Sequence, residues 1–514
     1  MMILQTRNAR RLSVLGCIAF SATAAFSPAA DLRPAALFSD GMVLQRDMAV
    51  PIWGWADPGE QVTVAFVGQT KSAVTDATGR WLLRLDPLPA NAEARILRLT
   101  GGASQRRFEI RAVLVGDVFQ CSGQSNAASS MDSCKRRPGT LEDIRGTTLP
   151  LVRIFQTPNA TFRAEPQENV GGKWEPIAPE NNARFSAVAF YFARAMHAHL
   201  QVPIGIVRAS HAGGAAEIKM PLEALLSIEW GRRFHADALK RYSAESLAAR
   251  DKIFLDRWRV AVTAAQSAGQ PVPPQPEPSP KVDGGYPCSD WNGVIAPVIR
   301  YAKRAVLWYQ GEHNAGRAFE YRELLPALIT SWRRASGQPD LPFVLVQLPA
   351  YGHAEAEKAW PLLRESQWFA QRATPHTALV VTIDRGERDN IHPADKREVG
   401  ERLALETRRL VFGENVTGCG SLYAGHRVEG AGIVVFFSGS ALQRIGGGFT
   451  IAGADRRFVP AAAAIRDSAT ILVSSPAVPQ PAAVRYAWAG WPTVSLFDEH
   501  GLPAAPFRTD DWEQ

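Results

Sequence analysis

Short apolar runs separated by turn residues dominate the chain from residue 31 to about residue 110. Val62, Val64 and Phe66 alternate with smaller or polar residues, which is the pattern of a strand with one buried face. A second run, residues 50–55, is rich in β-branched and aromatic side chains. We therefore expect a small β-sandwich over residues 31–110.

The pattern changes after about residue 112, where continuous apolar runs alternate with amphipathic helical stretches. Such alternation indicates a parallel sheet covered by helices on both faces, as in α/β proteins. The expected strands are residues 118–121, 204–207, 305–308, 343–348 and 378–381, and the expected helices include residues 186–200, 319–334 and 361–372. In this fold class, the residues that follow the strands gather at one edge of the sheet.

Composition divides the rest of the chain. Residues 222 to about 266 are charged and helical, and the proline-rich stretch 270–280 predicts a stiff extended connector. Beyond residue 413 the apolar strand pattern returns. The predicted organisation is a signal peptide over 1–30, an N-terminal β-sandwich domain over 31–110, an α/β domain in two parts over 111–221 and 286–413, a helical insertion with its connector over 222–285, and a C-terminal β region over 414–514.

The first thirty residues have the three parts of a secretory signal. Arginines precede a short apolar run, and small residues follow it, so that cleavage after Ala24, Ala29 or Ala30 is compatible with the pattern. The apolar run is too short to span a membrane. We therefore expect export to the periplasm or out of the cell, with no membrane span.

Charge argues against one class of partner. The net charge of the whole chain is +7, and removal of the predicted signal takes away three arginines and no acid, which leaves +4. No run of lysines and arginines interleaves with aromatic residues, so we expect no nucleic-acid partner. These features leave the oligomeric state open.

Four cysteines follow the signal, Cys121, Cys134, Cys288 and Cys419. They show no C-x-x-C motif and no Cys/His spacing typical of zinc, so we expect no metal and no other cofactor. In an oxidising compartment they could form one or two disulfides, with Cys121 and Cys134 the nearest pair, or equally remain buried thiols.

The stretch from Gly116 to Asn126 passes from a buried apolar strand into a small polar turn. Gly123 lets the chain bend sharply, and Ser125 is then presented at the end of a rigid element, which suits a nucleophile. Taken alone, these residues fit an ordinary strand-to-helix turn equally well, and the rest of the chain has to decide.

A carboxylate and a histidine lie close together far downstream. Asp389 precedes His392 by three residues, a spacing that on a turn lets the carboxylate orient one imidazole nitrogen and leaves the other free to act as a base. Asp384 is the alternative acid. Metal binding is the rival role for His392, but the sequence offers no set of partner ligands beside it.

Two segments between the serine and the histidine offer donors that could stabilise an oxyanion. Gly213 and Gly214 present unshielded backbone N–H groups, and Gln310 and Asn314 present side-chain amides after another predicted strand. His211 and His313 have no acid at an orienting spacing. We therefore expect these two histidines, with Asn126 and Glu312, to line the site rather than to act as the base.

Trp53, Trp55 and Trp81 form a separate aromatic group in the predicted N-terminal sandwich. Large aromatic side chains dominate the cores of small sandwiches, so we expect these three in the core. A platform on which a sugar ring stacks is the alternative.

The turn Gly123-Gln124-Ser125-Asn126 resembles the serine block of SGNH hydrolases. Taken with Trp308-Tyr309-Gln310-Gly311-Glu312 and Asp389-Asn390-Ile391-His392-Pro393, it is similar to the sialate O-acetylesterase family. The similarity extends to residues 37–45, 53–60 and 485–488, so it covers nearly all of the chain after the signal.

This resemblance implies an SGNH-hydrolase-like parallel sheet and a metal-independent serine esterase that forms an acyl-enzyme intermediate. By position, Ser125 would be the nucleophile, His392 the general base and then acid, and Asp389 its orienting partner. The backbone N–H groups of Ser125 and of Gly213 or Gly214 would hold the oxyanion, together with the amide of Gln310 or Asn314.

The resemblance also implies an acetylated sugar as the substrate, most directly 9-O-acetylated sialic acid. Acetylated xylan or another hemicellulose is the alternative substrate, and a catalytically silent carbohydrate-binding protein is the alternative of another class. The chain departs from the family beside the implied triad. Ala127-Ala128-Ser129 stands where members commonly carry Met-Glu-Trp, and Ala212 and His313 replace a tryptophan and a serine. These changes should open the pocket and weaken stacking on a sugar ring.

Overall fold

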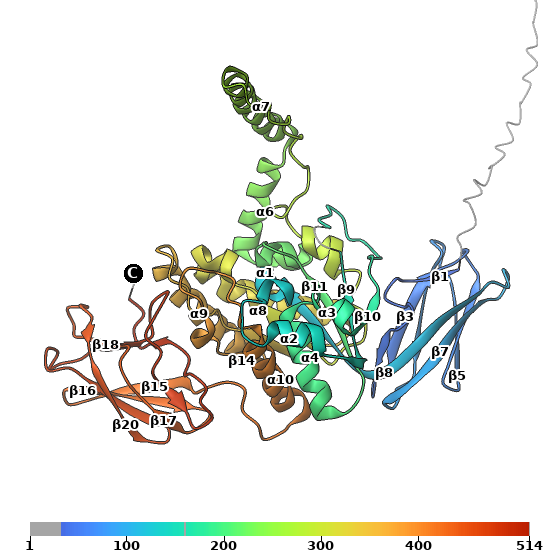
Figure 1. The fold of residues 1–514 in the computed structure, drawn as a ribbon. Helices are drawn as coiled ribbons and strands as arrows, with labels where there is room; N and C mark the ends of the chain where they lie inside the picture. The colour runs from blue at the N-terminus through green and yellow to red at the C-terminus, as the bar shows by residue number, and fades with distance from the viewer. Residues whose placement is uncertain (1–31, 159–160, 513–514) are drawn as a thin grey trace, which may run out of the picture.

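The computed structural model describes residues 32–158 and 161–512. The predicted signal peptide, residues 1–30, lies outside the described residues. The described chain is a mixed α/β protein, with one large sheet, helices that pack against it, and further β-sheets at the C-terminal end (Figure 1). The expected α/β class is thereby confirmed.

The loops that contain the candidate site residues follow strands of the large sheet. Its main path is β10 (Trp174–Ile177), β9 (Leu149–Gln156), β11 (Ile204–Ser210), β8 (Arg107–Gly123), β12 (Ala305–Tyr309), β13 (Phe343–Val346) and β14 (Thr377–Val380). Every neighbouring pair on this path is parallel except β10 with β9. Gly123 is in register with both Ser210 and Tyr309, so three strands end level with one another.

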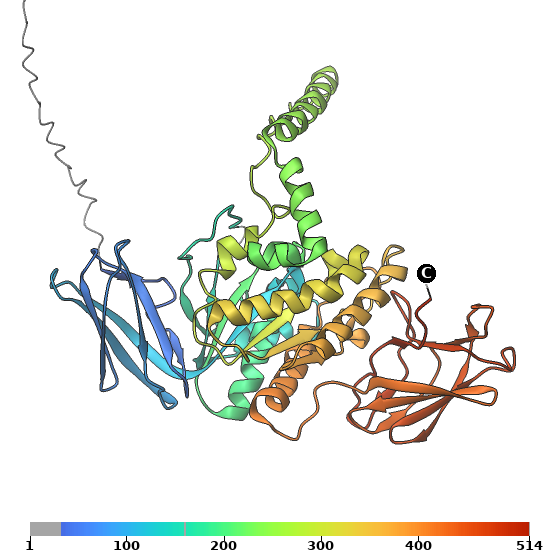
Figure 2. The ribbon, with the colours of Figure 1, turned by 180° about the vertical axis from the view of Figure 1, so that it is seen from behind.

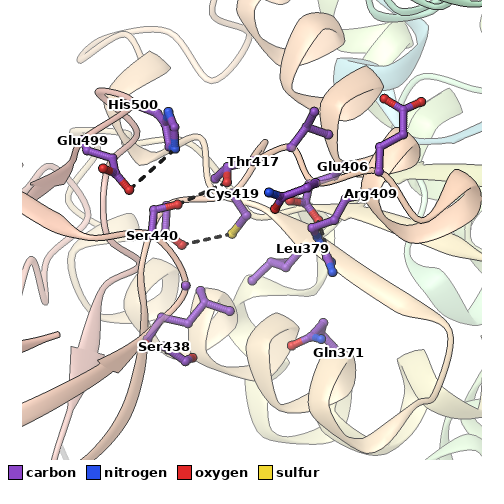
Figure 3. Close-up of a pocket in the computed structure, with 16 residues that line it drawn as sticks. Gln371, Leu379, Glu406, Arg409, Thr417, Cys419, Ser438, Ser440, Glu499 and His500 are labelled. Carbon is purple, nitrogen blue, oxygen red and sulfur yellow. Dashed lines mark hydrogen bonds and ion pairs between the residues drawn. The ribbon is translucent and has the colours of Figure 1, made fainter. Parts of the chain in front are cut away.

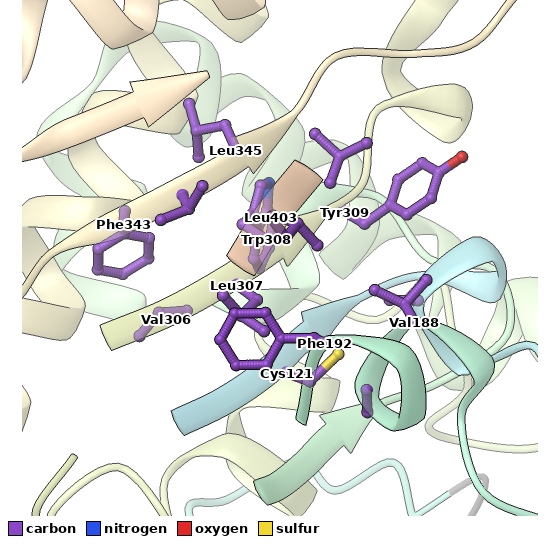
Figure 4. Close-up of a cluster of buried hydrophobic side chains, with 14 of the residues drawn as sticks. Cys121, Val188, Phe192, Val306, Leu307, Trp308, Tyr309, Phe343, Leu345 and Leu403 are labelled. Atoms are coloured by element: carbon purple, nitrogen blue, oxygen red, sulfur yellow. The ribbon is translucent and has the colours of Figure 1, made fainter. Parts of the chain in front are cut away.

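Helices cover both faces of this sheet, as the sequence pattern predicts. On one face Phe119 packs against Phe192 of α4 (Ala187–Leu200), with the ring centroids 4.9 Å apart. Trp308 is in register with Ser122 and so points to the opposite face, where it packs against Trp332 of α8 (Ala318–Ser336). Figure 4 shows Phe192 and Trp308 among the buried side chains that lie between strands and helices. Helices α10 (Lys396–Phe412) and α9 (Ala356–Ala373) pack against α4 and α8, respectively.

The N-terminal β region is continuous with the large sheet. One sheet consists of β1 (Arg33–Pro34), β3 (Val50–Trp55) and β6 (Arg80–Leu85), and β2 (Val43–Gln45), β4 (Gln61–Phe66), β5 (Gln69–Val74) and β7 (Asn91–Gly101) extend from the first half of β8. Both layers share one hydrophobic core. The expected domain boundary at residues 110 and 111 therefore falls inside a single strand, which bends at Ala112, where φ is +54°.

The helical insertion projects from the body of the molecule. It contains α5 (Leu222–Ser227), α6 (Glu229–Arg241) and α7 (Ala244–Ser267), and residues 270–280 after it have no helix or strand. In both views of the ribbon, α6 and α7 extend away from the sheet (Figures 1 and 2). Only Leu247 of α7 is buried.

The C-terminal region consists of three small antiparallel sheets that share a core. They are β15 (Leu422–Glu429), β16 (Gly432–Ser438), β21 (Thr470–Ser474) and β20 (Ala462–Asp467); β19 (Val459–Pro460), β18 (Phe449–Ala452), β22 (Ala483–Tyr486) and β24 (Phe507–Arg508); and the pair β17 (Leu442–Arg444) and β23 (Phe497–Asp498). Val381 and Ile383, which follow β14, join this core and attach the region to the large sheet.

Short helical turns connect the remaining elements. They are α1 (Ser125–Ala128), η1 (Asp132–Cys134), α2 (Thr140–Gly146), α3 (Pro179–Asn182), η2 (Ala216–Lys219), the π-helical turn η3 (Trp291–Ile295), η4 (Glu312–Arg317) and η5 (Ile383–Arg385). No helix among the described residues is long and apolar enough to cross a membrane.

The four cysteines left open by the sequence are all thiols in the structure. Burial raises the pKa of Cys121 and of Cys288 to about 12, which keeps both protonated at neutral pH. Within residues 32–158 and 161–512 there is thus no disulfide, and packing rather than cross-linking stabilises the fold.

Candidate active site

A sharp turn after β8 places Ser125 at the carboxyl edge of the sheet. Gly123 has φ +147°, and a Cβ atom at this position would lie 2.0 Å from the carbonyl oxygen of Tyr309. Only glycine therefore lets the chain pass so close to β12 before it turns. The N–H of Gln124 then donates to that same oxygen at 3.0 Å, which fixes the turn.

The structure brings Ser125 and His392 together although they are far apart in the sequence. The Oγ atom of Ser125 lies 2.8 Å from Nε2 of His392, within hydrogen-bond distance. The loop that carries His392 is held from both sides: the backbone N–H of His392 donates to Asn390, and its carbonyl accepts from Arg136 at 2.5 Å. The imidazole is therefore positioned to accept the proton of Ser125.

The two candidate acids lie in different surroundings. Asp389 is exposed and makes no hydrogen bond or ion pair with the residues that the structure describes, so its contact with His392 stays a prediction. Asp384 accepts two hydrogen bonds of 2.8 Å each from the buried guanidinium of Arg402. This pairing commits Asp384 to Arg402 rather than to His392.

Electrostatics favour the neutral form of His392. Partial burial lowers the pKa of the imidazole below its ordinary value, and the positive charges of Lys396 and Arg136 lower it further. A neutral ring is the form that can act as a base, so these neighbours extend the pH range in which the base is competent.

A buried polar network lies directly behind the serine. Asn126 donates to Glu312 and to the carbonyl of Ile391, and its Oδ1 accepts from Lys396 at 2.6 Å. Lys396 also donates to the carbonyl of Pro393 at 2.7 Å. Burial lowers the pKa of Lys396 to about 8 and raises that of Glu312. The network therefore ties the serine turn to the loop that carries the histidine.

This arrangement differs in part from the expected pocket lining. Asn126 and Glu312 lie behind Ser125 rather than in the pocket wall, because their polar groups are used by each other and by the histidine loop. No sequence pattern identifies Lys396 as a residue of the site. A lysine at the start of a helix is common, and only its position four residues after His392 could have indicated a role near that residue.

The two amides expected to complete an oxyanion hole are engaged elsewhere. Nε2 of Gln310 donates to Oδ1 of Asn314 at 2.7 Å, and Nδ2 of Asn314 donates to Glu217 at 2.9 Å. Both side chains are fully buried, and Gln310 also accepts from Tyr321. The amide nitrogens of this pair are thus hydrogen-bonded within a buried network.

The backbone donors remain accessible. The N–H of Ser125 opens helix α1 and has no acceptor within the helix. Gly213 and Gly214 both adopt a positive φ, at +73° and +85°, and their N–H groups make no hydrogen bond with the described residues. Three backbone donors are therefore available along this edge of the sheet.

Ser125 and His392 open into a cavity of about 690 Å³. Three arginines line it, Arg136, Arg184 and Arg208, together with Phe162 and His211. None of the three arginines was identified from the sequence, because scattered arginines carry no spacing signal. The cavity is large enough for a sugar derivative, and three cationic side chains lie in its wall.

His211 lies in the cavity wall, as expected, and belongs to a second buried network. Its Nδ1 lies 2.6 Å from Asp290, which also pairs with Lys219. Burial alone would raise the pKa of Asp290, but Lys219 and His211 hold it at about 2. His313 is exposed and is not part of this wall; its backbone N–H donates to Gln124 at 3.3 Å.

A separate cavity of about 640 Å³ lies where α9, β14 and α10 meet the C-terminal region (Figure 3). Its labelled lining includes the ion pair of Glu406 and Arg409 and the thiol of Cys419. Burial raises the pKa of Cys419, so this thiol is protonated and is not an activated nucleophile. Across the described residues, no group of three or more His, Cys, Asp or Glu side chains could hold a metal ion.

Known proteins share both the sequence and the fold. A family model described as "Carbohydrate esterase, sialic acid-specific acetylesterase" matches residues 295–409, a range that contains Asp389 and His392. The sialate O-acetylesterase of Mus musculus is 28% identical over 425 residues, covering 76% of this chain and 75% of that protein. The human sialate O-acetylesterase is 27% identical over 415 residues, covering 74% and 71%.

A solved structure extends the similarity to nearly the whole chain. The crystal structure of a carbohydrate acetylesterase from Xanthomonas citri is 33% identical and superimposes with a TM-score of 0.78. The match covers 93% of this chain and 100% of that one. The chain therefore belongs to the sialate O-acetylesterase family of carbohydrate esterases, and it is a carboxylic ester hydrolase.

Proposed function

We propose that this esterase removes O-acetyl groups from sugar hydroxyls through an acyl-enzyme intermediate at Ser125. The observation that supports this most directly is the 2.8 Å contact between Ser125 Oγ and His392 Nε2 at the floor of an open cavity. A serine hydroxyl is a weak nucleophile until a neighbouring base takes its proton, and a neutral imidazole at this distance provides that base.

In the proposed mechanism, His392 accepts one proton and then donates it in each half of the reaction. Nε2 accepts the proton of Ser125 as Oγ bonds to the acetyl carbonyl carbon, and the imidazolium then gives this proton to the departing sugar oxygen as the ester bond breaks. A water molecule next attacks the acetyl carbon, and His392 takes one of its protons. The imidazolium returns this proton to Oγ of Ser125 as the bond between Oγ and the acetyl carbon breaks, which restores the serine and releases acetic acid, which ionises to acetate.

The developing oxyanion needs donors that are already in place. The N–H groups of Ser125 and of Gly213 or Gly214 are the candidates that this geometry supports best, since Gln310 and Asn314 bond to each other and to Glu217. Asp389 remains the proposed orienting acid. A rotation of its exposed side chain toward Nδ1 of His392 would be needed, whereas Asp384 is fixed by Arg402.

The first proposed substrate is 9-O-acetylated sialic acid. Two observations support it: the mouse and human relatives carry the name sialate O-acetylesterase, and three arginines surround the cavity, where a sugar carboxylate could bind. The second candidate is acetylated xylan or a related hemicellulose. The short side chains of Ala128 and Ser129 in the cavity wall favour it, because they leave room for a branched or polymeric sugar.

The reaction and the substrate are tested together. Wild-type protein and Ser125→Ala protein would be incubated with 4-nitrophenyl acetate, with 9-O-acetylated sialic acid and with acetylated xylo-oligosaccharide, and acetate release would be measured. We expect kcat to fall by about 10³-fold or more in the variant on every ester that the wild type cleaves. Equal rates for the two proteins would exclude Ser125 as the nucleophile, and the ratio of kcat/KM for the two sugar esters separates the substrates.

We also infer an SGNH-type hydrolase domain formed by residues 111–221 and 286–413, and export directed by residues 1–30. Strands that end level at Gly123, Ser210 and Tyr309 support the first inference, since this family of folds places its serine at such an edge. N-terminal sequencing of the protein recovered from a periplasmic or culture fraction tests the second. A mature protein that begins at Met1 would contradict it.

A further inference from the structure

A second cavity, of about 650 Å³, lies between the N-terminal sheet β1–β3–β6 and the α/β part of the molecule. Four tryptophans line it: Trp53 and Trp55 from β3, Trp81 from β6 and Trp291 from the π-helical turn η3. We call this cavity the tryptophan cleft. It shares no lining residue with the cavity at Ser125.

The strand pattern shows which of these indoles belong to the core. Along β3, Val50 and Ile52 are buried, whereas the alternate positions, including Trp53 and Trp55, are half-buried. Side chains two residues apart share a face, so both tryptophans lie on the opposite face of β3 from Val50 and Ile52, where they line the cleft and still pack against the edge of the core. The expected core position is thus confirmed for Trp81, which is buried, whereas Trp53 and Trp55 are partly buried, pack against that core and also line the cleft.

Polar groups surround the half-buried indoles of Trp53 and Trp55. Arg80 and Glu168 form an ion pair across the cleft, and the indole N–H of Trp55 donates to Glu168 at 3.3 Å. Asp76 and Arg300 are the other charged residues of the lining. Among the residues that line the cleft, two carboxylates therefore match two guanidinium groups, while the guanidinium of Arg33 lies over the ring of Trp55.

This combination fits one class of ligand. The C–H face of a pyranose ring is apolar and packs flat on an indole, while its hydroxyl groups at the ring edge need planar donors and acceptors. The balanced charge of the lining favours a ligand with no net charge. We propose that the tryptophan cleft binds a neutral pyranose chain, and that this chain belongs to the acetylated glycan presented to Ser125; the second clause rests on the proposed function.

One short segment links the two cavities. Phe162 lines the catalytic cavity, and Gln167 and Glu168 line the tryptophan cleft. An extended chain advances by at most about 3.5 Å per residue, so Phe162 and Glu168 are separated by no more than about 21 Å. A few sugar units span that distance. Binding at the cleft would therefore raise the local concentration of an acetyl ester near Ser125.

Contacts hold this segment in place against the π-helical turn. The N–H of Gln167 donates to the carbonyl of Asn292 at 2.7 Å, and the side chain of Asn292 donates to the carbonyl of Ala164 at 2.7 Å. The cleft is thus formed before a ligand arrives, as small-molecule sites usually are.

Binding is tested with Ser125→Ala protein, so that the readout does not depend on hydrolysis. Unacetylated xylohexaose and cellohexaose, with sialyllactose as the charged comparison, would be titrated by calorimetry. We expect Trp55→Ala to weaken binding of the better neutral hexaose by about 10-fold, and Glu168→Gln, which retains the indoles, by a smaller factor. The matched control is Trp491→Ala, which removes a 39% exposed tryptophan of the C-terminal region and should leave the affinity unchanged.

Kinetics provide the second arm. In the otherwise wild-type enzyme, Trp55→Ala should leave kcat/KM for 4-nitrophenyl acetate within twofold and lower acetate release from an acetylated polysaccharide by about 10-fold. No binding of either hexaose, equal affinity in Trp55→Ala and its parent, or a preference for sialyllactose would overturn the proposal. If the wild-type enzyme released no acetate from any ester while the hexaose still bound to the cleft, the proposed function at Ser125 would be wrong and the proposal for the cleft would stand.

Discussion

At the scale of single residues, the site depends on how His392 is held and charged. Ser125 meets its Nε2, while Asn390 and Arg136 hold its backbone. Among the residues that the structure describes, no carboxylate contacts the imidazole, so its pKa is set by burial and by the neighbouring positive charges of Lys396 and Arg136. Two predictions follow from this balance.

The pH dependence should show a base with a lowered pKa. His392 must be neutral to accept a proton, and its pKa lies below the ordinary value of about 6.5, so kcat/KM should stay high at pH 6.5 and fall only at lower pH. Arg136→Gln removes a positive charge and leaves Glu387 unpaired beside the loop, so both effects raise the pKa and move the acid limb upward by about half a unit.

The comparison is a profile of kcat/KM from pH 4 to 9 for wild type, Arg136→Gln and Arg184→Gln. Arg184 also lines the cavity but is paired with Glu175, so its substitution should leave the limb in place. A limb that does not move in Arg136→Gln would show that this arginine does not tune the base.

The two candidate acids should differ in what their substitution changes. Asp389→Asn should lower kcat by roughly 10²-fold with little effect on the thermal unfolding midpoint, because the residue is exposed and its proposed role is to orient the imidazole. Asp384→Asn should mainly lower that midpoint, since it removes the charged partner of buried Arg402. If Asp389→Asn kept the wild-type kcat, the site would be a serine–histidine pair without that acid.

At the scale of elements, the serine is positioned by close contact between strand ends. Gly123→Ala would place a methyl group 2.0 Å from the Tyr309 oxygen at a strained φ, so we expect a loss of more than about 2 kcal/mol in the free energy of unfolding, together with loss of activity. Gly59→Ala is the matched control: its φ is +77°, but nothing lies within 4 Å of the added atom. Denaturant titration of both variants should show the larger loss at Gly123.

The sequence predicts elements better than it predicts the direction of side chains. Five strands of the large sheet have unbroken apolar runs, which is why they could be identified. Strand β9 mixes buried and half-buried residues, and β10 is only four residues long, and both were missed. Trp53 and Trp55 show the same limit, because alternation does not reveal that a side chain packed against the core also lines a cleft.

Contacts within the site were harder still to predict. Ser125 and His392 could be found because each follows a strand or precedes a helix at a characteristic turn. The pairing of Gln310 with Asn314, and of Asp384 with Arg402, depends on packing between segments far apart in the sequence. The local sequence around a residue does not indicate which distant side chain it will contact.

At the scale of the whole molecule, the helical insertion is the part least coupled to the catalytic sheet. Helix α7 buries only Leu247, and it packs against α6 rather than against the sheet. Replacing residues 245–281 with a short glycine–serine linker should therefore leave kcat for 4-nitrophenyl acetate within about threefold and the thermal midpoint within a few degrees. A collapse of either quantity would show that the insertion supports the site.

Strand β8, by contrast, is closely coupled to the catalytic sheet, because its continuous backbone pairs with strands of both the N-terminal region and the α/β part. Hydrogen bonds to β7 and β2 hold its first half, and hydrogen bonds to β11 and β12 hold the half that ends at Gly123. Amide protons on the two halves should therefore exchange with solvent at similar, slow rates, and calorimetry should resolve one joint melting transition for both regions. A chain shortened to begin near residue 111 would keep Ser125 and His392 but lose the strands that pair with the first half of β8. The strand that carries Ser125 at its end would then be less stable, so the N-terminal region is expected to be required for a folded, active enzyme.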